Sequence, residues 1–202
     1  MSTLKVNSIE SRTSGTSALT IDASGYLSAA QPVIAHIVMT SNQTNLTELQ
    51  WHKMNFDTAV IDTKSGFDNS NDRYIIPVAG HYRIYAQAFL GVDGEQNSTR
   101  DTGICITRTR SSTETQLAFS SHRHYNGSGD ASDVTEAVNI IDNCQAGDLI
   151  QFYTYVNTDT GTAYDVFADV DAADDNPHLN NNLPGTGSGQ GRSTFFTIER
   201  II

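Results

Sequence analysis

The amino-acid sequence predicts an all-β protein, built as a sandwich or a barrel. Apolar and polar residues alternate with a period of two, clusters rich in glycine, asparagine and aspartate separate the alternating segments, and no segment has a convincing helical pattern. From Pro32 onward we predict strands at residues 33–39, 50–56, 58–62, 73–78, 80–90, 103–110, 115–120, 134–142, 148–156 and 194–201.

The segment 73–90 shows the pattern most clearly. One face of its second strand carries Tyr82, Ile84, Ala86, Ala88 and Leu90, and the other carries His81, Arg83, Tyr85, Gln87 and Phe89. Pro77 cannot donate a ladder hydrogen bond, and Gly80 permits a turn that other residues resist. The segment is therefore predicted to form a strand, a corner and a second strand. A helix is disfavoured because Pro77 and Gly80 would both lie in its interior.

The first 30 residues differ from the rest. Leu19 and Ile21 alternate with polar residues, a turn is predicted at "DASG", and the apolar pattern resumes at Tyr26 and Leu27. We interpret this as a short hairpin or two extended pieces, too small to fold alone. The chain is thus expected to divide into an N-terminal arm, 1–30, which needs a partner surface, and one domain, 31–202.

Composition and charge exclude several functions. The 202 residues carry a formal net charge of −11, which argues against nucleic acid or an anionic membrane as a partner, and only 17% of them are charged. Membrane insertion is not expected, because no stretch approaches the length of an apolar span. The high content of threonine, serine, asparagine and glycine is typical of extracellular β proteins. No secretory signal or membrane span is apparent, which favours a protein assembled in a host cytoplasm and released by lysis.

No catalytic motif is found, so neither an enzyme nor a cofactor is expected. The unusual stretch 157–192 is interpreted as a solvated acidic loop, with a cation site as the less favoured alternative; the candidate ligands are Asp169, Asp171, Asp174 and Asp175. His122 and His124 point the same way on a strand, and three copies around an axis would resemble the iron sites of some phage fibres. Two exposed histidines are the favoured interpretation.

The two cysteines, Cys105 and Cys144, lie in or beside apolar strand-like segments. Two buried free thiols are favoured, and a disulfide between them remains the alternative.

An ordered series of motifs resembles the C1q head family, whose jelly roll is shared with tumour necrosis factor ligands. The series begins with Phe56-Asp57, Ile61-Asp62 and Gly66-Phe67, continues through the corner at 74–82, and ends with "AGDLIQFYTYV" and "STFFTIERII". The matching positions expected to form the family's core are Phe56, Phe67, Tyr74, Pro77, Gly80, Tyr82, Gly147, Asp148, Phe152 and Phe196. The chain departs from the family in its longer loop at 157–192 and in lacking a collagen-like stretch.

The resemblance implies a ten-stranded antiparallel jelly-roll sandwich that assembles as a homotrimer. The strand 148–156 is compatible with this, because it has Tyr153 and Tyr155 on one face and Ile150, Phe152 and Val156 on the other. A monomer that exposed one face of this sheet would not need apolar residues on both sides.

The opening "MSTLKVNSIESRTSG" with "ALTIDASGYLS" resembles the start of tail-fibre and other virion proteins of bacteriophages, especially those of cyanobacteria. The combined resemblance implies a virion structural protein on the particle surface, either a capsid cement (decoration) protein or a head fibre, with residues 1–30 contacting the major capsid protein. A tail-fibre tip that binds a host receptor or glycan is the first alternative, disfavoured because no long shaft precedes the domain. A non-viral C1q-like binding module is the second.

Overall fold

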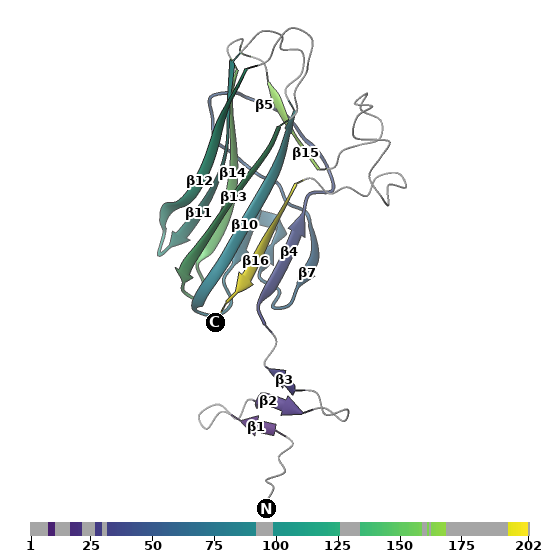
Figure 1. The fold of residues 1–202 in the computed structure, drawn as a ribbon, viewed down its shortest axis with the longest axis vertical. Coiled ribbons are helices and arrows are strands. Elements are labelled where there is room, and N and C mark those ends of the chain that lie inside the picture. Colours follow the sequence, from purple (N-terminus) through teal and green to yellow (C-terminus); the bar gives the residue numbers. More distant parts are fainter. Residues whose placement is uncertain are drawn as a thin grey trace, which may run out of the picture.

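The computed structural model describes residues 8–10, 17–21, 27–29, 32–91, 99–125, 134–158, 161, 163–168 and 194–201. They form an all-β structure in which two antiparallel sheets face each other, as the sequence predicts (Figure 1). Within these residues the helical content is one 3₁₀ turn, η1 (Asn69–Asn71). None of the described segments is a helix with the length and apolar character needed to span a membrane.

The first sheet has seven strands in the order β5-β15-β10-β16-β4-β7, and β13 pairs with the remaining side of β10. Its strands are β4 (Ile34–Val38), β5 (Gln43–Leu46), β7 (Thr58–Asp62), β10 (Gly80–Gly91), β13 (Val134–Cys144), β15 (Tyr164–Phe167) and β16 (Phe195–Arg200). The long strand β10 is the spine of this sheet, since it pairs with β13 along one side and with both β16 and β15 along the other.

The second sheet has six strands in the order β12-β11-β14-β9-β8, and the short β6 also pairs with β14. Its strands are β6 (His52–Lys53), β8 (Phe67–Asp68), β9 (Arg73–Ile75), β11 (Thr99–Arg110), β12 (Thr113–Tyr125) and β14 (Leu149–Thr158). In β14 buried and half-buried residues alternate along the whole strand, because one face packs on the first sheet and the other faces outward.

A third, small sheet comes from the N-terminal residues. Strand β2 (Ser17–Ile21) pairs with β3 (Leu27–Ala29), which is the predicted hairpin, and β1 (Ser8–Glu10) adds a further strand. Within the described part of the chain these strands pair only with one another. The division into an arm, 1–30, and a domain, 31–202, stays a prediction.

Aromatic rings join the two large sheets. Phe196 of β16 stacks on Phe152 of β14, with ring centroids 4.4 Å apart and an interplanar angle of 23°. Phe56 meets both rings edge-on, at 4.8 Å from Phe196 and 5.8 Å from Phe152. Tyr74 also meets Phe196 edge-on, at 6.5 Å. These four residues are 0–1% exposed, so the stack forms the centre of the hydrophobic core.

The corner after β9 carries the chain from one sheet to the other. β9 belongs to the six-stranded sheet and β10 to the seven-stranded sheet, and Pro77 lies in the break between them. The hydroxyl of Tyr82, whose side chain is buried, donates a 2.6 Å hydrogen bond to the carbonyl of Val78 and closes the corner. The bend falls at Val78 and not at Gly80, whose φ of 159° is close to extended backbone.

The turn before β8 needs a glycine. The carboxylate of Asp62 accepts hydrogen bonds from the amides of Gly66 and Phe67, at 3.2 and 2.9 Å. A Cβ at Gly66 would lie 2.5 Å from Cζ of Tyr74, which leaves no room for a side chain. Phe67, at the end of this turn, is partly buried against the core and contacts Phe196 edge-on at 6.2 Å.

Several strand boundaries differ from the sequence-based prediction. The strand predicted at 50–56 is only His52–Lys53, and β5 and β8 were not predicted at all. β11 and β12 extend beyond the predicted 103–110 and 115–120 because they pair with each other almost throughout their length. Within the predicted loop 157–192, residues 164–167 form β15, in which Tyr164 and Val166 are buried.

Replacing Tyr82 tests the corner. Tyr82→Ala is expected to lower the free energy of unfolding by about 3–5 kcal/mol, because it empties a large site in the core. Tyr82→Phe keeps the ring and loses only the bond to Val78, so it should cost about 0.5–1.5 kcal/mol. Chemical denaturation monitored by circular dichroism measures both, and equal losses for the two variants would show that the ring contributes nothing.

Candidate interaction surfaces

The outer face of the seven-stranded sheet carries a row of aromatic and aliphatic side chains. The ring of Phe195 (β16) stacks on His36 (β4) at 5.3 Å and 11°, and lies 5.7 Å from Tyr85 (β10). Ile61 of β7 pairs with His36 in the register, and Ile141 of β13 pairs with Arg83; their exposed fractions are 47% and 58%. We call Ile61, His36, Phe195, Tyr85 and Ile141 the aromatic row.

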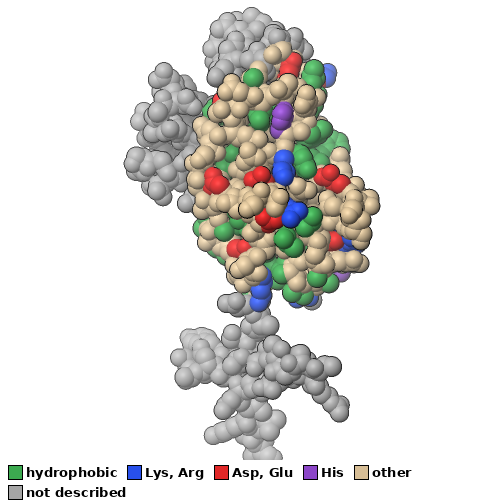
Figure 2. All heavy atoms as spheres, turned by 180° about the vertical axis from the view of Figure 1, so that it is seen from behind, with side chains coloured by type: hydrophobic (Ala, Val, Ile, Leu, Met, Phe, Trp, Pro, Cys, Tyr) green, Lys and Arg blue, Asp and Glu red, His purple; other side chains and the backbone are tan. Residues whose placement is uncertain are grey.

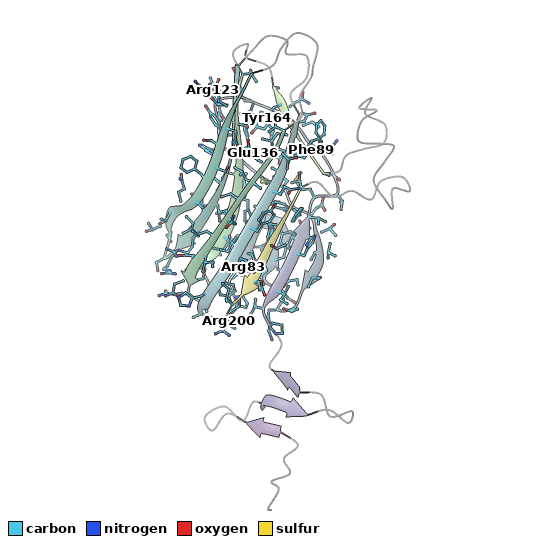
Figure 3. The ribbon with its side chains drawn as sticks, in the orientation of Figure 1. Arg83, Phe89, Arg123, Glu136, Tyr164 and Arg200 are labelled. Atoms are coloured by element: carbon cyan, nitrogen blue, oxygen red, sulfur yellow. The ribbon has the colours of Figure 1, made fainter. Side chains whose placement is uncertain are left out.

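The row crosses β7, β4, β16, β10 and β13 from edge to edge. Further along β10, Phe89, labelled in Figure 3, lies 5.6 Å from Phe167 of β15 but is only 8% exposed, so the open part of the surface is the aromatic row itself. Apolar side chains gathered on a sheet face in this way are typical of an interface between proteins.

The outer face of the six-stranded sheet centres on Trp51. Its ring lies 5.3 Å from that of Tyr155 on β14, and it covers Gly103 of β11, where a Cβ would lie 3.3 Å from the indole Cη2. Trp51 nevertheless remains 46% exposed. In Figure 2, the view from behind Figure 1, hydrophobic, acidic and basic side chains are interspersed and not segregated by type.

Two hollows flank Trp51 on this face. The larger, about 470 Å³, has Asp101, Phe119 and Arg123 among its lining residues. The smaller, about 310 Å³, is lined by Cys105, Thr107, Glu114, Gln116 and Tyr153 together with Trp51. The indole is thus the shared wall of two adjoining recesses.

Charged and hydroxyl groups in the hollows are held in place by hydrogen bonds. Arg123 donates from Nε and Nη2 to the two carboxylate oxygens of Asp101, at 2.7 and 3.0 Å, and these bonds lower the pKa of Asp101. Glu114 accepts from Thr107 at 2.8 Å and from the Tyr153 hydroxyl at 3.2 Å. Burial, with the nearby Glu114, raises the pKa of Tyr153 to about 12, so its hydroxyl stays protonated at neutral pH.

A buried carboxylate lies near the larger hollow. Glu136 of β13 is fully buried; it accepts a 2.5 Å hydrogen bond from the Thr102 hydroxyl and lies 2.7 Å from Nδ1 of His122. These contacts join β13 to β11 and β12, so they tie the edges of the two sheets together. Glu136 was not among the predicted site residues, although the alternation of Val134, Glu136 and Val138 puts all three on one face.

The metal-site predictions remain untested. His122 is engaged with Glu136, and the side chain of its predicted companion His124 lies outside the described residues. Asp169, Asp171, Asp174 and Asp175 lie outside them as well. Among the side chains that the structure describes, no group of three or more potential ligands comes together.

The turn formed by Gly147 and Asp148, which belongs to the motif series, is held by charge-assisted hydrogen bonds. Gly147 has a φ of +87°, which favours glycine, and Asp148 is 2% exposed. Asp148 accepts bonds from Nε and Nη2 of Arg110, at 2.8 and 2.6 Å, and from the Gln145 amide at 2.7 Å. Burial alone raises the pKa of Asp148, but these bonds outweigh it and hold the pKa below its usual value. Arg108 pairs similarly with Asp142.

Both cysteines are free and buried, so the thiol interpretation is confirmed and the disulfide alternative is wrong. Burial raises the pKa of Cys105 to about 11 and that of Cys144 to about 12, and neighbouring carboxylates add to both shifts. Neither thiol is an activated nucleophile.

Comparison with known proteins supports the fold. The structure is similar to the Eiger TNF of S. frugiperda, with a TM-score of 0.54 and 12% identity over 86% of this chain and 94% of that one. It is also similar to murine APRIL at pH 5.0, with a TM-score of 0.52 and 12% identity over 85% and 100%. The globular domain of zebrafish complement 1qA gives 0.49 and 10% over 85% and 98%. No family model matches the sequence, and no curated protein matches it.

The fold is therefore a TNF-like jelly roll, as the motif series implied. At this level of identity the likeness shows the architecture alone.

Reactivity of the thiols tests their burial. Ellman's reagent at about pH 8, near the ordinary thiol pKa of ~8.5, is expected to leave Cys144 unmodified in the folded protein, because this thiol is fully buried and protonated. In guanidinium chloride both cysteines should react within minutes. Rapid reaction of Cys144 under native conditions would contradict its placement in the core.

Proposed function

We propose that this chain is a non-enzymatic structural protein on the surface of a bacteriophage particle, where it works as a homotrimer that reinforces or decorates the capsid or forms a head fibre. The observation that carries the proposal is the aromatic row. It places aromatic and aliphatic side chains across one entire sheet face, and burying such side chains against other copies of the chain can drive assembly into a ring.

The outer faces of the two sheets differ in chemistry, and this difference decides which face we assign to the trimer contact. The aromatic row has one stacked ring pair and one tilted ring pair, with an aliphatic residue at each end. The opposite face has its aromatic residues beside two hollows and several charged groups, among them Asp101 and Arg123. The outer face of the seven-stranded sheet also carries Arg83 and Glu199, which pair with each other at 3.4 Å. Aromatic and aliphatic side chains are enriched at the core of a homo-oligomer interface, so we assign the trimer contact to the aromatic row.

The N-terminal sheet supports attachment to a larger assembly. Its outer strands β1 and β3 each pair on one side only within the described part of the chain, and strand edges of this kind can accept a strand from a partner. The sequence of this region resembles the opening of phage virion proteins. The net charge of −11 disfavours DNA as the partner, and we propose the major capsid protein instead.

A second role has an observation of its own in favour of it. The exposed Trp51 and its two hollows suit a receptor-binding module, such as the tip of a tail fibre that contacts a host-surface glycan. The jelly roll itself is equally compatible with a non-viral C1q-like binding module. The location of the protein in a purified particle would separate these roles.

Disrupting the aromatic row tests the trimer. Multi-angle light scattering should give three times the 22.0 kDa chain mass, or ~66 kDa, for the natural sequence. Phe195→Asp should give the monomer mass with an unchanged circular dichroism spectrum, because three unpaired charges at a buried interface cost about 3–5 kcal/mol each.

Phe119→Asp is the matched control, since Phe119 is 58% exposed on the outer face of the other sheet. It should remain trimeric. A 22 kDa particle for the natural sequence would refute the proposed assembly.

Deleting residues 1–30 tests attachment to a particle. The truncated protein should still form the trimer, because the aromatic row lies within the domain 31–202, but it should no longer be incorporated into phage particles. Quantitative mass spectrometry of purified particles measures incorporation. Normal incorporation would show that the arm is not the anchor, and would favour attachment through the globular domain.

A further inference from the structure

We propose that the outer face of the six-stranded sheet binds a neutral oligosaccharide, with one sugar ring stacked on Trp51 and adjoining sugars seated in the two flanking hollows. This site rests on the proposed function in one respect, because its face must point away from the trimer axis to be accessible. It uses none of the residues of the aromatic row.

Trp51 is held in a fixed position although it is exposed. Here one side of the ring covers Gly103, whose missing side chain leaves room for it, and Tyr155 supports it at 5.3 Å. Almost half of the side chain stays open to solvent. The result is a fixed, flat apolar platform, which matches the C–H face of a pyranose ring.

Two recesses adjoin the Trp51 platform. The recesses of about 470 and 310 Å³ both use Trp51 as a wall, so they adjoin at the indole. Phe119 adds a second aromatic ring to the larger recess, and Tyr153 adds one to the smaller. A ligand that stacks on Trp51 and fills both recesses must extend on either side of the stacked ring, as a chain of linked sugars does.

Polar side chains line both recesses. The larger recess offers the Asp101–Arg123 pair, and the smaller offers Glu114 and Gln116. Carboxylates accept hydrogen bonds, guanidinium donates them, and an amide does both. A sugar hydroxyl is likewise both donor and acceptor, so a ring rich in hydroxyls can satisfy this mixture while its C–H face covers the indole. The internal bonds of Asp101 and Glu114 hold these groups in position before binding.

The same lining disfavours other ligands. A nucleic acid or an acidic polysaccharide would bring negative charge to recesses that hold Asp101 and Glu114, on a chain with a net charge of −11. A peptide that binds by strand addition would need the free edge of the sheet, which lies along β12, whereas Gly103 beneath the indole is already paired with β12 and with β14 on its two sides. A neutral sugar chain needs neither positive charge nor a free edge.

The chain offers a direct reporter, because Trp51 is its single tryptophan. We would titrate the full-length protein with cellohexaose, laminarihexaose, mannohexaose and β-1,4-galactohexaose, and follow tryptophan fluorescence. At least one of these neutral hexamers should give a saturable change below about 10 mM, which allows for weak binding with a Kd near ~1 mM. Oligogalacturonate of equal length should give none, because it carries negative charge.

Calorimetry then identifies the site with the hexamer that binds. Trp51→Ala should weaken binding by at least about tenfold, as truncation of a central aromatic anchor does. Leu49→Ala is the matched control: Leu49 is 59% exposed in the same loop but lines neither recess, so its substitution should leave the affinity unchanged.

Light scattering on the same samples keeps the two proposals apart. Absence of binding by all four neutral hexamers to a folded trimer would overturn the sugar site and leave the assembly intact. Binding of oligogalacturonate alone, or equal losses for Trp51→Ala and Leu49→Ala, would also overturn it. Binding to a protein that scatters as a monomer would support the site and refute the trimer.

Discussion

The ring of Phe196, on strand β16 of one sheet, stacks on Phe152, on strand β14 of the other, with centroids 4.4 Å apart. Phe56, from the segment between β6 and β7, meets both rings edge-on and is 1% exposed. The ring contacts pack one face of each sheet against the other sheet. In every strand the side chains on that face therefore point into the core, and the side chains that alternate with them point outward. The surfaces available for assembly and for binding follow from that division.

The two outer faces differ in chemistry although both carry aromatic residues. On the seven-stranded sheet Phe195 stacks on a histidine and contacts Tyr85 at a tilt, and these rings form a surface suited to another copy of the chain. On the six-stranded sheet Trp51 stands between recesses with charged walls, a surface suited to a polar ligand. A jelly roll that assembles through one face and binds through the other can present three copies of a weak site together, and their combined affinity can far exceed that of one site.

The sequence was sufficient to predict the elements whose signals are local. Alternation identified β10 and β14, and Pro77 marked the break at which the chain changes sheets. The short strand β5 was not predicted because its sequence, "QTNL", is largely polar and contains Asn45 at a φ of 58°. Once each strand is placed in its sheet, alternation predicts which side chains form the aromatic row. The Trp51 site could not be predicted in this way, because its partner Gly103 is brought beneath the indole only by the tertiary fold.

Cryo-electron microscopy of the purified full-length protein would test most directly the assignment of assembly to one face and binding to the other. The account predicts three copies around an axis, with Tyr85 and Phe195 facing the axis and Trp51 facing solvent. A trimer with Trp51 buried between copies and the aromatic row in solvent would contradict it, as would a particle that contains a single chain.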